Sequence, residues 1–163
     1  MNRLISLSMT CLMALAICTV TSCSKEVGEE VSDGYVNLGL SSGTKWKAIN
    51  ETKSDFFPYD EAMDQFGDKL PTKEQWMELV KECKWTWTGS GYRVVGPNGQ
   101  RITLPAAGYR EDGRVCSVGF AGCYWSSTND VSYYAWHISF NETYVNMYAY
   151  DWRYGFSVRL VEN

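Results

Sequence analysis

Aromatic side chains that could bind a ligand are concentrated near the end of the chain. Residues 120–156 contain 13 of the 24 aromatic residues and a single cationic side chain, Arg153. Over residues 144–152, Tyr, Asn and Trp recur at every second position, with Val145, Met147 and Ala149 between them. Because successive side chains of a strand point to opposite faces, the Val/Met/Ala set would face the core and the Tyr/Asn/Trp set would face solvent. Tyr and Trp offer a large, rigid contact area with a polar edge, so the pattern predicts a binding face.

The preceding segment, 134–140, contributes polar groups to the same face. Its alternation places Trp136, Ile138 and Phe140 on one side and His137 and Ser139 on the other, together with Asn141. We therefore expect a surface that binds a glycan or a protein. Contact area would come from Tyr144, Tyr148, Tyr150 and Trp152, and hydrogen bonds from His137, Ser139 and Asn146. The alternative is that these aromatics form a second core layer.

Catalytic and metal-binding patterns are weak in this sequence. His137 is the only histidine and lies in the alternating segment 134–140, which argues against a Ser-His-acid triad. Glu111 and Asp112 precede Gly113 and indicate a solvated turn rather than a carboxylate pair. The segments 128–130 and 141–142 each offer two oxygen ligands, and a turn is the expected role of both. We predict a protein that is not an enzyme and uses no metal or cofactor.

The six cysteines suggest one disulfide. No CxxC pair is present, and with a single histidine a Cys/His zinc site is not expected. Cys116 and Cys123 are separated by six residues, enough for a loop to close, and we expect a bridge between them. Cys83 falls on the apolar stripe of a predicted helix, where its expected role is packing.

Two helices and several short strands would position the binding face. Thr72 and Gln75 form a capping box, and Trp76, Leu79, Val80 and Cys83 then follow at helical spacing as a buried stripe. Residues 60–66 are a second helical candidate. Strands are expected over 35–40, around 46–49, over 92–95 and 101–104 on either side of a turn at 96–99, and over 124–127, 134–140, 144–150 and 156–161. One or two helices followed by many strands predict an α+β fold. The expected core comprises Trp76, Leu79, Val80, Trp125, Ile138 and Phe140.

Composition restricts the class of protein. The 163 residues are 45% hydrophobic and 21% charged, with a net charge of −4, which excludes a disordered chain. The length suits one domain. Scattered Lys and Arg residues and a pI near 5 argue against a nucleic-acid partner.

The chain begins with a predicted export signal. Arg3 precedes an apolar run over residues 4–20, which is barely long enough to span a membrane and ends in small polar residues. Val-Thr-Ser-Cys at 20–23 resembles the lipobox of bacterial lipoproteins. That resemblance implies a signal peptide over 1–22, lipidation of Cys23, and attachment to a membrane without spanning it. Residues 23–33 form an acidic tether, similar to the signal that sends Bacteroidetes lipoproteins to the surface of the outer membrane.

Several motifs in the mature chain together resemble one family. They are Tyr-Val-Asn-Leu-Gly-Leu-Ser at 35–41, Leu-Pro-Thr-Lys-Glu-Gln-Trp at 70–76, Cys-Lys-Trp-Thr-Trp at 83–87, Leu-Pro-Ala-Ala-Gly-Tyr-Arg at 104–110, Tyr-Trp-Ser-Ser at 124–127 and Gly-Phe-Ser-Val-Arg at 155–159. In this order they are similar to the Fibrobacter succinogenes major paralogous domain. That family resembles the C-type lectin-like fold of the formylglycine-generating enzyme superfamily. The resemblance covers residues 34–163 and implies two helices packed on twisted antiparallel sheets, with the ends of the domain close together.

The same segments suggest three functional interpretations. The C-terminal part resembles the variable region of proteins diversified by retroelements, which implies that His137, Ser139, Tyr144, Asn146, Tyr148, Tyr150 and Asp151 are variable contact positions. A structural subunit of a fimbrial or envelope assembly is the first alternative. The second is an oxidase of the formylglycine-generating type, which would use Cys116 and Cys123.

Overall fold

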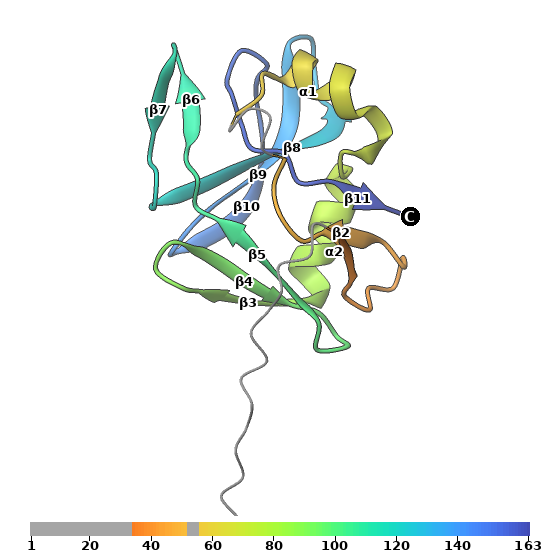
Figure 1. Cartoon of the computed structure of the whole chain (residues 1–163). Helices are drawn as coiled ribbons and strands as arrows, with labels where there is room; N and C mark the ends of the chain where they lie inside the picture. Colours follow the sequence, from red (N-terminus) through yellow and green to blue (C-terminus); the bar gives the residue numbers. More distant parts are fainter. Residues whose placement is uncertain (1–33, 52–55) are drawn as a thin grey trace, which may run out of the picture.

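The computed structural model describes residues 34–51 and 56–163. Within this part of the chain, two α-helices pack against four small antiparallel sheets, so the predicted α+β class is confirmed (Figure 1). No helix among the described residues is both long enough and apolar enough to cross a membrane. The predicted signal peptide, Cys23 and the acidic tether lie outside the described residues.

The helices and most strands follow the chain in the order expected from the sequence, and three short strands, over 84–87, 109–111 and 114–116, were not predicted. The helices are α1 (Tyr59–Phe66), a 3-10 turn η1 (Gly67–Lys69) and α2 (Lys73–Glu82). One sheet has the order β1 (Tyr35–Asn37), β2 (Lys45–Lys47), β11 (Val161–Glu162), and a second has the order β3 (Lys84–Trp87), β4 (Gly91–Val95), β5 (Arg101–Pro105). A third has the order β10 (Tyr144–Asp151), β9 (Tyr134–Asn141), β8 (Ala121–Asn129), and β6 (Tyr109–Glu111) pairs with β7 (Arg114–Cys116). Since β1 and β11 pair with opposite edges of β2, the two ends of the domain lie close together, as expected.

Helix α2 begins at the predicted capping box. Thr72 Oγ1 accepts from Gln75 N at 3.2 Å, and Gln75 Oε1 accepts from Thr72 N at 2.9 Å. Trp76 and Leu79 are fully buried, whereas Val80 is 36% exposed. The prediction that Val80 is a core residue is therefore wrong, because the apolar stripe is narrower than the sequence spacing indicated and Val80 borders an open hollow. Cys83 is half-buried at the C-cap.

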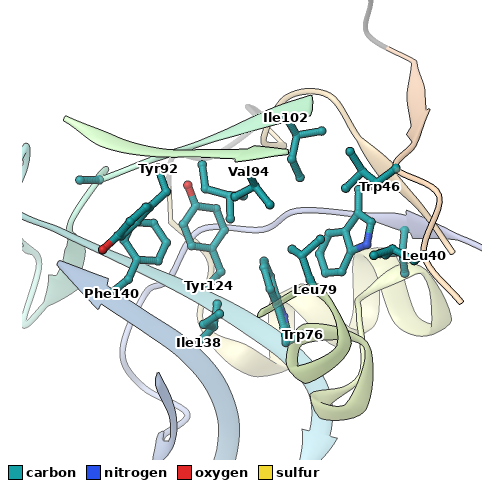
Figure 2. Close-up of a cluster of buried hydrophobic side chains, with 14 residues drawn as sticks. Leu40, Trp46, Trp76, Leu79, Tyr92, Val94, Ile102, Tyr124, Ile138 and Phe140 are labelled. Carbon is teal, nitrogen blue, oxygen red and sulfur yellow. The ribbon is translucent and has the colours of Figure 1, made fainter. Parts of the chain in front are cut away.

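The β8–β10 sheet separates two hydrophobic clusters. On one side, Trp46 and Trp76 pack with a centroid distance of 4.6 Å, and Tyr124, Ile138 and Phe140 pack beneath the β3–β5 sheet (Figure 2). On the other side, the buried members are Phe57, Tyr59, Ala62, Leu70, Cys123, Trp125, Ala135, Phe156, Val158 and Leu160. The predicted core positions Trp125, Ile138 and Phe140 are thereby confirmed. Strands β8 and β9 contribute buried side chains to both clusters, and β10 lies at the edge of the sheet.

The closing Gly-Phe-Ser-Val-Arg segment is structural. Arg159 is 1% exposed and donates to the carbonyls of Lys47, Ala48 and Thr103 and to Asn50 Oδ1. The predicted strand over 156–161 is reduced to β11 and to isolated bridges such as Phe57 with Phe156. This segment lies between β8 and the residues before α1, so each neighbour pairs with it for only a few residues.

Candidate ligand-binding site

A hollow of about 330 Å³ opens on the face of the β8–β10 sheet that carries His137. We call it the tyrosine groove. Its lining residues are Tyr109, Cys123, His137, Ser139, Tyr144, Tyr148, Ala149, Tyr150, Tyr154 and Phe156. The volume lies at the lower end of the range of small-molecule sites, which are typically 300–1,000 Å³. Ten residues from β6, β8, β9, β10 and the following segment thus converge on one concave surface.

Strand register explains why the predicted residues meet. Tyr148 of β10 lies opposite His137 of β9, and the next position along the same face places Asn146 opposite Ser139. Val145 and Met147, on the other face, pack against the first cluster. The rim of the groove consists of Tyr144, Tyr148 and Tyr150, which are 40%, 44% and 43% exposed. The predicted alternation of β10 is therefore confirmed.

His137 lies at the bottom of the groove among aromatic rings. Its ring centroid is 4.5 Å from that of Phe156 and 5.8 Å from that of Tyr150, and only 4% of the residue is exposed. This burial lowers the pKa of His137 to about 4, so the imidazole is neutral at neutral pH. Its Nδ1 atom is buried and has no hydrogen-bond partner among the described residues. A buried polar atom without a partner is uncommon in a folded protein, and here a ligand can supply one.

Ser139 and Cys123 supply the other polar side chains at the bottom of the groove. Ser139 Oγ lies 3.8 Å from Cys123 Sγ, and burial raises the pKa of Cys123 to about 11, so the group is a protonated thiol at neutral pH. The expected Cys116–Cys123 disulfide is not formed, and both cysteines are free. The reason is their placement: Cys123 points into the groove from β8, whereas Cys116 ends β7 opposite Tyr109 in a different sheet.

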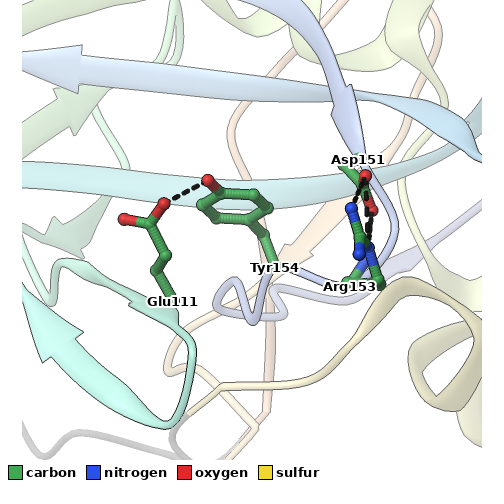
Figure 3. Close-up of polar contacts among 4 residues, drawn as sticks. All are labelled: Glu111, Asp151, Arg153 and Tyr154. Carbon is green, nitrogen blue, oxygen red and sulfur yellow. Dashed lines mark hydrogen bonds and ion pairs between the residues drawn. The ribbon is translucent and has the colours of Figure 1, made fainter.

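Two polar contacts fix the segment after β10 (Figure 3). The Tyr154 hydroxyl donates to Glu111 Oε1 and links the groove wall to β6. This contact raises the pKa of Tyr154. Arg153 pairs with Asp151, with Nη2 2.8 Å from Oδ2, and lowers the pKa of that carboxyl to about 2. None of these three charged groups lines the groove, and neither does any other Asp, Glu, Lys or Arg side chain in the described part of the chain. The site therefore suits an uncharged ligand.

Two of the predicted contact residues lie outside the groove. Asn146 is exposed on β10, but its Oδ1 accepts from Met147 N and it lines a different hollow. Strand β10 ends at Asp151, so the alternation stops before Trp152. The Trp152 ring is partly buried and packs against the second cluster, 5.1 Å from the ring of Tyr59. The core-layer interpretation is correct for Trp152, and Tyr144, Tyr148 and Tyr150 remain exposed.

A family described as "Domain of unknown function (DUF8237)" matches residues 73–161. This span is more than half of the chain. The chain belongs to this family. No curated protein and no solved structure matches the chain. The DUF8237 region contains every residue that lines the tyrosine groove, whereas β1, β2 and α1 precede it.

Sequence reasoning missed five groove residues of this DUF8237 domain, which are Tyr109, Cys123, Ala149, Tyr154 and Phe156. Cys123 had been assigned to a disulfide, and Ala149 to the set that faces the core. Tyr154 belongs to the aromatic-rich segment 120–156, so the composition of that segment could have identified it as a candidate. Tyr109 lies about 30 residues before the other tyrosines, and no local spacing connects it with them. It reaches the groove because Gly108 and Gly122 form a bridge that sets β6 beside β8. At Gly108, with a φ of +81°, an added Cβ would lie 2.0 Å from the Cys116 carbonyl oxygen, so the approach requires glycine.

The other candidate ligand positions serve local structure. Asn141 Oδ1 accepts from the backbone and hydroxyl of Thr143 and from Tyr144 N, which is the geometry of a turn. Thr128 Oγ1 accepts from Lys73 N at the start of α2. In the ranges that the structure describes, no three His, Cys, Asp or Glu side chains gather in a way that could hold a metal ion.

Proposed function

We propose that this protein is a lipoprotein anchored at the bacterial outer membrane and exposed at the cell surface, whose domain binds an extracellular glycan in the tyrosine groove. The lipobox-like residues Val20–Cys23 support the anchor. Membership of the Fibrobacter succinogenes major paralogous domain family, and a C-type lectin-like fold, are part of the proposal. Their support is the ordered set of motifs and an α+β fold whose two ends flank β2.

The observation that carries the proposal is a buried, neutral histidine beneath exposed tyrosine rings. Sugar rings present an apolar face that stacks on aromatic side chains, and hydroxyl groups at their edge. Tyr148 and Tyr150 offer such stacking surfaces, and His137 Nδ1 offers an acceptor or donor that has no partner within the described chain. The absence of charged lining residues among those described favours a neutral glycan over an acidic one. Affinity would come from a few aromatic anchors.

Binding of neutral glycans to an array, followed by calorimetry, tests the proposal. We expect Tyr148→Ala combined with Tyr150→Ala to lower affinity at least tenfold, because both anchors are lost, while the Tm changes little. Tyr134→Ala is the matched control: Tyr134 is as exposed as Tyr150, at 43%, and lies outside the groove. Failure to bind any neutral glycan, or an equal loss in the control variant, would contradict the proposal.

Diversification by a retroelement is a further part of the proposal. One hollow, the tyrosine groove, is lined by five of the predicted variable positions, His137, Ser139, Tyr144, Tyr148 and Tyr150. Substitutions there would change which ligand is bound without altering the first core cluster. Sequencing this gene in many isolates tests the idea. Substitutions through adenine positions should cluster at these residues, and uniform variation along the chain would contradict it.

A permanent assembly interface is the second candidate. Val115, Val118 and Phe120 are 50%, 60% and 78% exposed on β7 and the turn that follows it. Exposed apolar groups that lie together are typical of surfaces that meet another protein. Sedimentation of the protein and of its Val118→Ser/Phe120→Ser variant tests this, since only an assembly subunit would lose self-association. The oxidase alternative lacks comparable support, because burial keeps Cys123 protonated and Cys116 lies in another sheet.

A further inference from the structure

A second hollow, of about 360 Å³, lies on the opposite side of β10 from the tyrosine groove, between that strand and α2. We call it the α2–β10 cleft. Its floor is apolar and includes Met77, Val80, Trp136 and Met147, of which Met77 is 53% exposed. Strand β10 is eight residues long and pairs only with β9 among the described strands. The cleft therefore combines an apolar floor with an unpaired strand edge.

The charges around the α2–β10 cleft have one sign. Lys73 and Lys81 line it, and none of its lining residues is acidic. Lys73 Nζ is held 3.1 Å above the centre of the Trp136 ring. Two of the three acidic side chains of α2 are already engaged, since Glu78 and Glu82 accept backbone hydrogen bonds from Ser42 and Ser41. The third, Glu74, is exposed and does not line the cleft. Neither lysine makes a salt bridge with another described residue, so both remain available to carboxylates of a partner.

The separation of the two lysines sets a spacing for those carboxylates. Eight residues along a helix rise about 12 Å. An extended chain rises about 3.3 Å per residue, so about four residues span this distance, and residues i, i+2 and i+4 share one face. A strand lying along β10 could thus place an acidic side chain near each lysine and an apolar side chain over the floor between them.

We propose that the α2–β10 cleft binds an extended peptide segment of a partner protein with the pattern acid-x-apolar-x-acid, which adds as a strand to the edge of β10. Backbone hydrogen bonds to β10 would give affinity, and the two lysines and the apolar floor would give register and selectivity. This site is separate from the proposed glycan site, because the two hollows lie on opposite faces of the same sheet.

Fluorescence anisotropy with a labelled peptide, Thr-Glu-Thr-Ile-Thr-Glu-Thr, and the full chain in detergent tests the proposal. A peptide of the same composition with the second Glu moved by one residue is the register control, and we expect it to bind at least tenfold more weakly. Lys73→Glu with Lys81→Glu should abolish binding at low salt. Lys69→Glu with Lys84→Glu matches the change in net charge at exposed lysines outside the cleft and should leave binding intact.

Strand addition is tested separately by methylating the peptide amides. In an added strand, alternate amides face β10, so methylation of one alternate set should abolish binding and methylation of the other should not. The proposal would be overturned if both sets of methylated amides weakened binding equally, or if the register-control peptide bound as tightly as the first peptide. An equal loss of binding in the two double lysine variants would also overturn it. Tyr148→Ala/Tyr150→Ala should leave peptide binding unchanged, so failure of the glycan proposal is distinguishable from failure of this one.

Discussion

His137 is the only histidine of the chain, and its burial couples protonation to stability. The pKa falls from 6.5 to about 4 on folding, so between these values the unfolded chain binds a proton that the folded chain does not. The neutral His137 therefore does not lower the free energy of unfolding above pH 6.5, and the free energy decreases as the pH falls toward 4. At pH 4.5 the loss from this group is about 2.5 kcal/mol.

We predict that His137→Phe removes this pH dependence and retains the fold, because phenylalanine keeps an aromatic ring among Trp125, Tyr150 and Phe156. Urea unfolding at pH 7.5 and pH 4.5 measures the difference between the two proteins. Carboxyl groups titrate in both proteins and cancel in that difference. An unchanged pH dependence would show that His137 is charged or exposed in the folded state. The same variant should lose glycan affinity, since Nδ1 is absent.

The three cysteines of the domain should differ in reactivity. Burial raises the pKa of Cys83 and of Cys123 to about 11, so little thiolate is present at pH 8, whereas Cys116 is half-buried at the end of β7. We predict that iodoacetamide labels Cys116 first in the folded protein and labels all three equally in urea. Peptide mass mapping measures the order. If Cys116 and Cys123 reacted only after addition of a reductant, the result would show that they form the disulfide predicted from the sequence.

At the scale of single elements, the start of α2 depends on one side chain. Thr72 satisfies the N–H of Gln75, and this hydrogen bond is lost in Thr72→Ala. We predict a loss of about 1 kcal/mol in unfolding free energy, the usual cost of removing such a cap. Glu74→Gln, on the exposed side of the same turn, should change stability by less than about 0.5 kcal/mol. Chemical denaturation of both variants measures the difference, and equal effects would mean that the cap contributes nothing.

Local sequence patterns correctly predicted α2, β9 and β10. Tertiary contacts decide where β10 ends and which part of α2 is buried. The capping box and the alternation of β9 and β10 depend on neighbouring residues, so the sequence alone indicated them correctly. Val80 was assigned to the core because its spacing fits the stripe, but no element covers that part of α2. Trp152 was assigned to the β10 face because the alternation extends to it in the sequence. The turn that ends β10 is fixed by the Asp151–Arg153 pair and by packing on Tyr59, which the spacing does not contain.

At the scale of the whole molecule, pairings between distant segments were the least predictable feature. The α+β class follows from the order of helices and strands. The sheet β1–β2–β11 joins residues more than 100 positions apart, and Arg159 bonds to the carbonyls of Lys47 and Thr103. The same kind of contact brings Tyr109 to the tyrosine groove. A candidate face was thus predictable, but its concave shape was not.

These long-range contacts predict that the family-matched region does not fold by itself. Residues 73–161 contain the whole tyrosine groove, yet 8 of the 25 buried hydrophobic residues described lie before residue 73, among them Trp46, Phe57 and Leu70. Removing them would expose Trp76 and Trp125 and leave β11 without its partner β2. Seven of these eight side chains are large, and each contributes about 1.5–3 kcal/mol. Their total, about 10–20 kcal/mol, is as large as the usual stability of a whole domain, about 5–15 kcal/mol.

We expect a fragment of residues 73–161 to give a poorly dispersed amide NMR spectrum and no cooperative thermal transition, whereas residues 34–163 give a dispersed spectrum and a single transition. Adding a separately produced fragment of residues 34–72 is the informative control. Because β2 and the segment before α1 supply buried surface rather than groove residues, this fragment should restore the dispersed spectrum at sufficient concentration. A folded 73–161 fragment would show that the family-matched region is the stable unit and that β1, β2 and α1 are accessory.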